Sequence, residues 1–534
     1  MPALESKVDV LIIGAGPAGL MCAHGLAKAG VDVRIIDKRP SKVAAGQADG
    51  IQPRTIEVLQ SYGLAERLLK EGNQMHMAAF YNPAADGSGI ERSDRLPDVT
   101  APTARFPFEV TLHQGAIENI FRDAMRALGK GQAPSGACPR EFEKRSDASD
   151  KFSWPSRSIE VEQPVVPTSI SLSTDAAELA SRDSYPVTVH LKRLSETEAQ
   201  RLARPVAGAP PNSNEAAADG SNVEVEEDRE EIVRAKYVVG CDGAHSWTRA
   251  QMGWKMEGEH TDYVWGVVDT IPDTDFPDIR NRTAIHSDNG SCMIVPREGD
   301  LVRLYVQIAE IELGGTGRMD RGKMTPEKIL GVAKRSFKPF RLEFPKPLDW
   351  WTIYIIGQRV ASNFSAQERV FIAGDAFVIR TADARPFEIQ DLIPSDIRYK
   401  LIVFAGNTKD VMQKARIQKL ADELEKPERF CKKYTPAGAA VDTIFEILVV
   451  SSMTKTTGDY TDVPATLRTH WSKVFMDDVS VSPRLGGGQL YETYGIGSEG
   501  CVAVVRPDGY IGTIVPLEGV DELDSWFGGI MASD

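Results

Sequence analysis

Residues Val8–Gly19 read VDVLIIGAGPAG, and this stretch decides the fold of the first part of the chain. The apolar run Val8–Ile13 predicts a buried strand, and three glycines follow it with the spacing GxGxxG. Helix-forming residues continue over 20–29, Gly30 ends that helix, and Val31–Ile36 predicts a second strand. A strand, a helix and a strand in this order predict a parallel sheet covered by helices.

The glycine run itself predicts a dinucleotide site. Gly14 permits the tight turn, Gly16 lets a pyrophosphate approach the backbone, and Gly19 lets the helix pack on the strand. The start of the helix supplies N–H groups and the positive end of its dipole. Asp37 ends the second strand about 20 residues further on, where an acid meets a ribose hydroxyl. The other residues predicted to bind the dinucleotide are Ala18, which precedes Gly19, and Lys38, which follows Asp37.

Composition narrows the class of protein. The chain has 534 residues, 62 Lys and Arg against 76 Asp and Glu, and a formal charge of −14. This length predicts more than one domain, and the acidic balance disfavours nucleic-acid and membrane-surface roles. Six scattered cysteines without a CxxC pair argue against a disulfide scaffold and against a metal site. The longest apolar run, Val10–Met21, is too short to span a membrane, so we expect a cytoplasmic protein.

The rest of the chain divides by composition. Pro, Ser, Glu and Ala dominate from about 130 to 235, which predicts an exposed and partly disordered insertion around a strand at 186–191. Buried-strand character resumes at Tyr237–Gly243 and returns at Val370–Asp375. A different unit then begins at Phe377. Its predicted elements are a strand at 398–405, a helix at 410–425, a hairpin over 501–515 and a final short helix.

Two short elements join the N-terminal glycine run. Cys241–Ser246 reads CDGAHS, and Val370–Ala376 reads VFIAGDA. Each alone is typical of a strand that ends in an Asx-turn. Together, in this order, the three elements resemble the signatures of single-component flavoprotein monooxygenases with the para-hydroxybenzoate hydroxylase fold. The resemblance implies that the Gly-Asp element meets FAD and that the Asp-Gly element serves both FAD and NADPH. The residues implied are Gly374, Asp375, Asp242 and Gly243.

Further stretches are similar to the phenol 2-monooxygenase subgroup. They are Gly46–Glu57, Leu112–Gly115, Tyr263–Asp269, Phe276–Arg280, Ile294–Glu298 and the C-terminal hairpin Val504–Tyr510. The subgroup implies an α/β fold in which a Rossmann-like FAD-binding domain carries a mixed-sheet substrate domain. Residues 1–376 would form this part, with FAD regions at about 1–130, 232–260 and 350–376 and the substrate sheet mainly at 261–349. Residues 377–534 would form a thioredoxin-like α/β domain, with a homodimer as one possibility.

The resemblance also implies a reaction, in which FAD, NADPH and O₂ hydroxylate a phenol through a flavin C4a-hydroperoxide. A carboxylate can draw the phenolic proton and make the ring more nucleophilic. Read from the residues alone, Asp49-Gly50 is a turn before a helix at Pro53. The resemblance instead makes Asp49 the catalytic base, because the matching aspartate faces the substrate.

Other candidates for the site are less specific. Arg280 or Arg282 could lie over the phenolate or the flavin, and a surface salt bridge is the alternative for either. Tyr263 is the nearest candidate for a substrate-facing tyrosine, and Gln114 resembles a flavin-contacting glutamine.

One departure from the family follows Ala376. The resembling enzymes continue into a loop with histidine and proline and then into a GQGMN-like turn along the flavin ring, whereas Phe377 already resembles the start of the last domain. Without the loop and turn along the flavin ring, the reactive end of the flavin would be open to water. Two alternatives therefore stand beside hydroxylation. One is an impaired or inactive paralogue that binds FAD or acts through its C-terminal domain, and the other is an NADPH oxidase or epoxidase.

Overall fold

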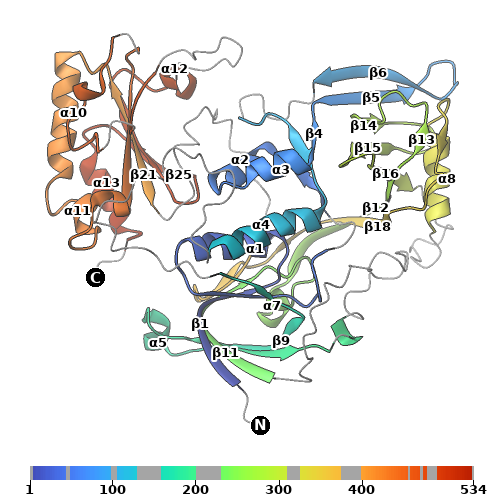
Figure 1. The fold of residues 1–534 in the computed structure, drawn as a ribbon, viewed down its shortest axis with the longest axis horizontal. Coiled ribbons are helices and arrows are strands. Elements are labelled where there is room, and N and C mark those ends of the chain that lie inside the picture. Colours follow the sequence, from blue (N-terminus) through green and yellow to red (C-terminus); the bar gives the residue numbers. More distant parts are fainter. Residues whose placement is uncertain are drawn as a thin grey trace. The chain divides into compact units, whose positions relative to one another are not determined.

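The computed structural model describes residues 4–43, 48–97, 105–128, 158–195, 197–199, 230–308, 325–373, 398–454, 457–469, 473–477 and 490–531. These residues fall into two units, which comprise most of 1–381 and most of 382–534 (Figure 1). Each unit has its own sheets and its own hydrophobic core. The fold is therefore α/β, as the sequence predicts.

The first sheet is built around the strand that precedes the glycine run. β1 (Leu4–Ile13) lies between β2 (Val33–Ile36) and β11 (Glu230–Gly240), and both neighbours are parallel to it. Helix α1 (Pro17–Lys28) follows β1, and α4 (Gln114–Leu128) lies beside α1 over the sheet (Figure 1). The predicted strand, glycine turn, helix and strand are thus confirmed.

The remaining strands extend this sheet on both sides. β20 (Val370–Ile372) pairs in parallel with β11, and the sheet runs in the order β19-β20-β11-β1-β2-β8. The outer strands are β8 (Val161–Glu162), β9 (Val165–Leu172), β10 (Val187–Arg193) and β19 (Ser365–Ala366), of which β10 joins β9 to β11. Within the predicted insertion, the structure thus describes three strands and a short helix, α5 (Ala176–Ala180). The other parts of that insertion lie outside the described residues.

The three strands that precede the predicted cofactor residues end at one edge of the sheet. Ile13 pairs with Gly240, and Gly240 pairs with Ile372, so β1, β11 and β20 end side by side. Open α/β sheets bind their ligands outside the carboxyl ends of such strands. This pairing brings the ends of β1, β11 and β20 together at one edge of the sheet.

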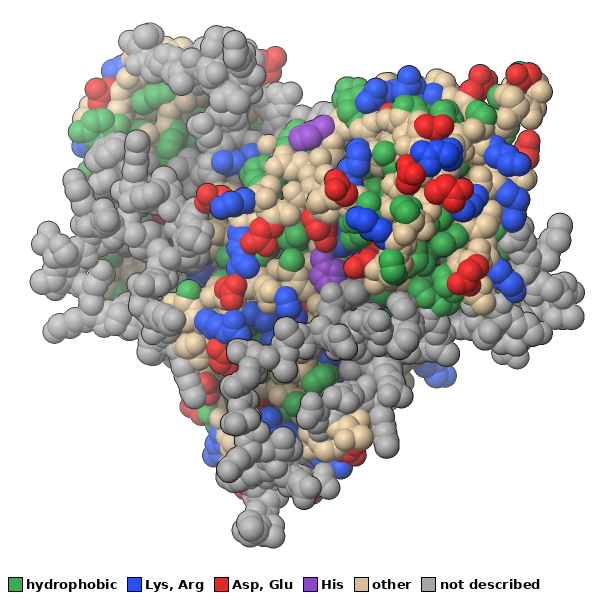
Figure 2. Space-filling view, turned by 45° about the vertical axis from the view of Figure 1, so that its right-hand side comes forward, with side chains coloured by type: hydrophobic (Ala, Val, Ile, Leu, Met, Phe, Trp, Pro, Cys, Tyr) green, Lys and Arg blue, Asp and Glu red, His purple; other side chains and the backbone are tan. Residues whose placement is uncertain are grey.

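A seven-stranded sheet forms the second layer of this unit. Its order is β18-β12-β16-β15-β14-β5-β6, and only β14 and β5 are parallel neighbours. The strands are β5 (Met77–Pro83), β6 (Ile90–Pro97), β12 (Met256–Thr270), β14 (Arg282–Ile285), β15 (Cys292–Pro296), β16 (Val302–Ile308) and β18 (Trp350–Ala361). Hydrophobic side chains lie between groups of charged ones over this part of the molecule (Figure 2).

Helix α8 (Pro326–Ser336) covers one face of the seven-stranded sheet. Ile329 and Val332 of this helix share a core with Val264, Val268 and Leu304 of the strands. Because successive residues of a strand point to opposite faces, Asp269, Arg303 and Tyr305 point away from α8.

Short elements connect the two sheets. β3 (Gly50–Ile51), β7 (Glu109–Thr111) and β4 (Asn73–Met75) form a three-stranded sheet, and α2 (Pro53–Ser61) begins at the predicted proline. The others are α3 (Ala65–Glu71), α7 (Trp247–Gln251), β13 (Asp273–Thr274) and β17 (Leu342–Glu343). None of the helices in the described part of the chain combines the length and the apolar character that crossing a bilayer requires.

The C-terminal unit is a five-stranded sheet with helices. Its order is β23-β22-β21-β24-β25, in which β21, β22 and β23 are parallel and β24 and β25 form the predicted hairpin. The strands are β21 (Tyr399–Gly406), β22 (Phe445–Ser451), β23 (Val474–Met476), β24 (Cys501–Val505) and β25 (Ile511–Val515). The helices are α10 (Val411–Leu424), α11 (Phe430–Lys433), α12 (Leu490–Tyr494) and α13 (Val520–Gly528). The predicted strand, helix and hairpin are confirmed, and the thioredoxin-like class stays a prediction.

Candidate functional site

The glycine turn between β1 and α1 has the shape of a phosphate cradle. Gly14 has φ +103°, and a Cβ there would lie 2.4 Å from the Cys241 carbonyl oxygen, so the turn after β1 packs tightly on the turn after β11. A Cβ at Gly19 would lie 1.9 Å from the Gly14 carbonyl oxygen. A Cβ at Gly16 would instead have no atom within 4 Å, and Gly16 caps α1 without a side-chain hydrogen bond. The first turn of α1, which includes Ala18, therefore faces open space with its backbone N–H groups.

Asp37 closes the other side of the cradle. Its carboxylate accepts hydrogen bonds from the Ala15 N–H (2.7 Å), the Arg39 N–H (2.7 Å) and the Arg39 guanidinium (3.0 and 3.1 Å). Burial opposes ionisation of Asp37, but these donors and the charge of Arg39 hold its pKa below the ordinary value. Asp37 is thus a fixed anion at the end of β2, and Lys38 beside it is exposed.

Gln114 belongs to the same network. It begins α4, and its side-chain amide donates to Glu118 Oε1 at 3.0 Å. Glu118 is fully buried, accepts from the Val43 N–H at 3.1 Å and meets Arg39 at 3.4 Å. The network ties α4 to the glycine turn, and the flavin contact of Gln114 stays a prediction.

The Asp-Gly element after β11 has a clear local role. Asp242 Oδ1 accepts from Ser246 Oγ at 2.6 Å, and Oδ2 accepts from the Thr248 N–H at 2.9 Å. Both bonds fix the start of α7, as the plain Asx-turn interpretation predicts. Gly243 has φ +83°, and a Cβ there would meet nothing within 4 Å, so the glycine is required by its backbone conformation and not by close packing. A cofactor role for either residue stays a prediction.

The third element is only partly described. β20 ends at Ile372, and the Ala373 N–H donates to the Gly240 carbonyl at 2.9 Å. Gly374 and Asp375 lie outside the described residues, as does the junction after Ala376.

A second run also has the spacing GxGxxG, and sequence reasoning missed it. Gly495–Gly500 reads GIGSEG, but it stands after α12 and before β24. A dinucleotide turn needs the opposite order, in which a strand precedes and a helix follows. Gly500 serves packing instead, because a Cβ there would lie 2.0 Å from the Phe404 carbonyl oxygen.

Asp49 is a buried carboxylate at the junction of the two layers. It directly precedes β3, and its carbonyl accepts from the Leu112 N–H at 2.9 Å. Only 5% of its surface is exposed. Asp49 Oδ2 lies 3.1 Å from Arg297 Nη1 and 3.2 Å from Arg303 Nη1, yet neither contact has hydrogen-bond geometry. Within the part of the chain that the structure describes, this buried oxygen therefore has ion-pair contacts but no hydrogen-bond donor.

Burial decides the proton affinity of Asp49. Removal from water raises the pKa of the carboxyl, the positive charges of Arg303 and Arg297 oppose that rise, and Asp269 adds to it. The net direction is upward, which makes Asp49 a better proton acceptor than an ordinary aspartate. The plain interpretation as a simple turn residue accounts for neither the burial nor the arginines.

Asp269 completes a buried group of four charges. It accepts from Arg303 Nε at 2.7 Å and Nη2 at 2.8 Å, and from Arg297 Nη1 at 3.1 Å. Arg297, Arg303 and Asp269 are each exposed by 1% or less, so each charge depends on its partners for compensation. The buried quartet Asp49, Asp269, Arg297 and Arg303 therefore carries two charges of each sign.

Aromatic side chains surround the quartet on the face away from α8. The Arg303 guanidinium lies 5.1 Å from the ring centre of Trp350, and Tyr305 is on the same strand as Arg303. Tyr354 lies opposite Trp265 in the β12–β18 ladder and is 41% exposed. The face thus offers apolar rings beside a buried proton acceptor, the combination that binding a phenol requires.

The two predicted arginines have defined partners. Arg280 donates to the Leu301 carbonyl at 2.8 Å and to the Arg297 carbonyl at 2.9 Å, so it holds the turn that carries Arg297. Arg282 forms an ion pair with Glu109 at 3.0 Å. A direct contact of either arginine with substrate stays a prediction. Tyr263 lies within β12, and its side chain is outside the described part.

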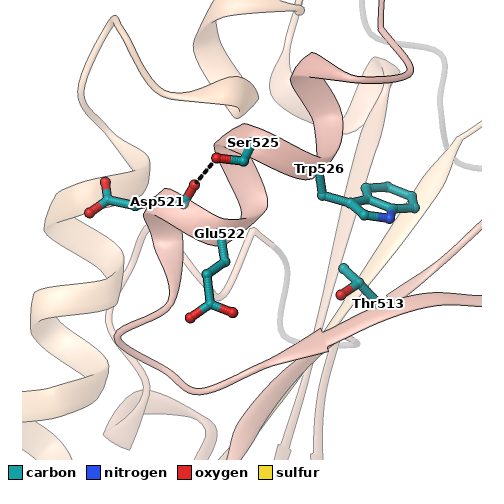
Figure 3. A pocket seen from close by; sticks show the side chains of 5 residues that line it. All are labelled: Thr513, Asp521, Glu522, Ser525 and Trp526. Carbon is teal, nitrogen blue, oxygen red and sulfur yellow. Dashed lines mark hydrogen bonds between the residues drawn. The ribbon is translucent and has the colours of Figure 1, made fainter.

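A depression in the C-terminal unit lies apart from these groups in the chain. Thr513 of β25 and four residues of α13 line it, and Ser525 Oγ donates to the Asp521 carbonyl at 3.0 Å (Figure 3). The other lining residues are Glu522 and Trp526. Its two acids make it a poor candidate for a dinucleotide phosphate.

Comparison with known proteins gives the family. Residues 7–381 match the family described as an FAD binding domain, and residues 358–534 match the phenol hydroxylase C-terminal dimerisation domain. Phenol 2-monooxygenase fsqG of Aspergillus fumigatus is 31% identical over 374 residues, which cover 70% of this chain and 50% of that protein. 3-Hydroxybenzoate 4-monooxygenase of Comamonas testosteroni is 32% identical over 389 residues, with the same two coverages. The chain therefore spans about half the length of these two relatives.

A third relative matches from end to end. FAD-dependent monooxygenase terD of Aspergillus terreus is 26% identical, and the match covers 98% of this chain and 96% of that protein. The alignment runs over 668 positions, although this chain has 534 residues, so many positions of terD have no counterpart here. The segment predicted to be absent after Ala376 stays a prediction.

Two solved structures share the fold. Aklavinone-11 hydroxylase in complex with FAD and aklavinone has a TM-score of 0.52 at 18% identity, over 97% of this chain and 98% of that one. The flavin-dependent monooxygenase PieE has a TM-score of 0.53 at 12% identity, over 99% of each chain. The family matches above show that the chain belongs to the FAD-dependent monooxygenases, in the group that resembles phenol 2-monooxygenase.

Proposed function

We propose that this protein is an FAD- and NADPH-dependent monooxygenase that hydroxylates a phenolic aromatic substrate. The observation that carries the proposal is Asp49, a buried carboxylate that contacts two arginines beside an aromatic face in an FAD-binding fold. NADPH as the reductant rests on the family resemblance.

The residues present fit FAD. Gly16 leaves open space at the start of α1 for the pyrophosphate, and Asp37 is placed for the adenosine ribose at the end of β2. Gln114, Asp242 and Gly243 border the same crevice in our proposal. FAD, when bound, supplies the electron transfer and the activation of O₂ that protein side chains lack.

The chain's own residues would act on the phenol. Rings such as Tyr305 and Tyr354 would hold the aromatic substrate, and the phenolic O–H would donate to the Asp49 carboxylate. Partial transfer of that proton to Asp49 raises the electron density of the ring at the carbon that receives oxygen. The paired charges of Arg297 and Arg303 stabilise Asp49 as a carboxylate before the proton arrives.

Reconstitution tests this function. The purified chain is expected to acquire a visible flavin absorbance band with FAD and to oxidise NADPH faster when a phenol is present. Hydroxylated product should form in proportion to the NADPH consumed. Protein that stays colourless after incubation with FAD would contradict the proposal.

A second candidate is oxidation of NADPH without hydroxylation. The departure from the family pattern after Ala376 motivates it, because the loss of a segment beside the flavin would admit water. Hydrogen peroxide in place of product would identify this activity. A cytoplasmic location stays a prediction in either case.

We also propose a homodimer that forms through the C-terminal unit. β25 is an edge strand of the described sheet, and its Ile511 and Ile514 are each 57% exposed. Exposed apolar side chains on an edge strand favour pairing with another chain, and the matching family is described as a dimerisation domain. A second copy of this chain is the partner that we propose.

Charge on this strand is expected to separate the dimer. The double variant Ile511→Lys, Ile514→Lys should weaken self-association at least about tenfold, because two ammonium groups would be desolvated at the contact. Sedimentation should then give the 58.5 kDa monomer. Val411→Lys is the matched control, since Val411 is 80% exposed on α10 of the same unit. Equal association of all three proteins would exclude β25 as the interface.

A further inference from the structure

We infer that Asp269 determines the charge of the ligand that this site accepts: by neutralising Arg297 and Arg303, it makes the site select an uncharged, protonated phenol over an anionic aromatic. The inference rests on the proposed function, whose phenol site it specifies. Asp269 is a specificity-determining residue that acts through the two arginines and not through the substrate.

The position of Asp269 is set by strand pairing. Asp269 on β12 lies directly opposite Arg303 on β16 in the antiparallel ladder. Their side chains face the same side of the sheet and form a two-point contact, from Nε to Oδ1 at 2.7 Å and from Nη2 to Oδ2 at 2.8 Å. Such a paired geometry fixes the guanidinium in one orientation.

Arg297 is shared between the two carboxylates. Its Nη1 lies 3.1 Å from Asp269 Oδ2 and 3.1 Å from Asp49 Oδ2, so the two carboxylates lie within roughly 6 Å of each other, the range in which charges shift each other's pKa. Glu298 adds a further contact, 2.9 Å from Arg297 Nη2. Arg280 holds the backbone of this turn through the Arg297 carbonyl at 2.9 Å.

The charge balance follows from these contacts. Asp49 and Asp269 offset Arg297 and Arg303, and Glu298, which is 30% exposed at its side chain, adds one more negative charge. Among the described residues, Asp49 Oδ2 is buried between the two arginines as an ion-pair partner. A phenolic O–H can donate to the Asp49 carboxylate, whereas a phenolate would place a second anion against it. The site as built therefore prefers the neutral phenol.

Other ionisable groups also surround the quartet. They are His113 before α4, Tyr305 on β16, Tyr354 on β18, and Asp349 before β18. Asp349 is exposed, and burial raises the pKa of each tyrosine, so both tyrosines stay neutral at ordinary pH. Desolvation lowers the pKa of His113, so this ring is neutral near pH 7. None of these groups replaces the negative charge of Asp269.

Bound 4-nitrophenol tests the inference in the FAD-loaded protein. Its phenolate absorbs at a longer wavelength than the phenol, so difference spectra across pH give the pKa of the bound ligand. Asp269→Asn should leave one uncompensated buried cation and lower that pKa by about one unit or more. The affinity for the anion relative to the neutral ligand should rise about tenfold, the factor that one unit represents.

Two further variants separate charge from general damage. Asp278→Asn is the matched control, because Asp278 is also fully buried on this layer but pairs with Tyr81, Arg92 and Arg95. It should leave the pKa of bound 4-nitrophenol unchanged. Glu298→Gln should lower that pKa by a smaller amount than Asp269→Asn, since Glu298 is partly exposed. This variant keeps the test decisive if Asp269→Asn fails to fold.

The outcomes are distinct from those of the proposed function. A lowered pKa in Asp269→Asn and Glu298→Gln supports the inference even if the protein never hydroxylates a phenol. An unchanged or raised pKa in these variants overturns the inference even if hydroxylation is observed. Failure of the wild-type protein to bind 4-nitrophenol would overturn both.

Discussion

Replacing Asp49 with asparagine is expected to slow hydroxylation of a phenol about 10²–10⁴-fold, the usual contribution of a positioned base. The amide keeps the size of the side chain but accepts no proton from the phenol. Reduction of the flavin by NADPH should change far less, because the proposed role of Asp49 lies at the phenolic oxygen. Rapid-mixing measurements of the two half-reactions separate these effects.

The control for this variant is another buried acid. Asp278→Asn removes a fully buried carboxylate from its partners on the same layer, and it tests how much loss comes from disturbed packing. Equal losses of flavin reduction and hydroxylation in Asp49→Asn would contradict the base role. Loss of hydroxylation in proportion to loss of folded protein would do the same.

The pH dependence of hydroxylation also tests the role of Asp49. Because burial raises its pKa, the carboxylate becomes protonated at a higher pH than an ordinary aspartate. Hydroxylation by the wild-type protein should therefore decline on the acid side before an ordinary aspartate would titrate. In Asp49→Asn this decline should be absent from the residual rate.

Two glycine substitutions in the cradle are expected to have contrasting effects, one mainly on FAD affinity and the other mainly on stability. Gly16→Ala should leave the free energy of unfolding within about 1 kcal/mol of the wild type, because its φ of −74° suits alanine and its Cβ would meet no atom within 4 Å. FAD affinity should nevertheless fall at least about tenfold, since the methyl group occupies the space of the pyrophosphate.

Gly14→Ala should instead damage the fold itself. Gly14 has φ +103°, and the added Cβ would lie 2.4 Å from the Cys241 carbonyl oxygen. Strain and overpacking of this kind cost about 2–4 kcal/mol of stability. Thermal unfolding and FAD titration of both variants measure the contrast. Unchanged FAD affinity in folded Gly16→Ala would place the cofactor elsewhere.

Local sequence patterns predict the first sheet more completely than they predict the candidate site. Val8–Ile13 is a continuous apolar run because β1 is flanked by strands and buried on both faces, and that local pattern is enough to predict it. The order strand, glycine turn, helix is equally local. The contact between the glycine turn and Cys241 could not be predicted from local sequence, because it depends on β11, which pairs with β1 from more than 200 residues away.

The buried quartet shows what local patterns miss. Asp269 and Arg297 lie in stretches that resemble the phenol 2-monooxygenase group, yet no spacing rule links them to Asp49 or to Arg303. The ladder between β12 and β16 brings Asp269 and Arg303 together, and the turn after β15 adds Arg297. An alternating strand such as Leu301–Gln307 with an arginine between apolar residues was the available signal. Arg39 was missed in the same way, although it stands two residues after Asp37.

Isotopically labelled oxygen tests the central claim most directly. The FAD-loaded chain is incubated with NADPH, a phenol and ¹⁸O₂, and the products are examined by mass spectrometry. The account predicts a dihydroxylated ring that carries one ¹⁸O atom, in an amount that follows the NADPH consumed. NADPH consumption that yields only hydrogen peroxide, or a ring without ¹⁸O, would contradict it.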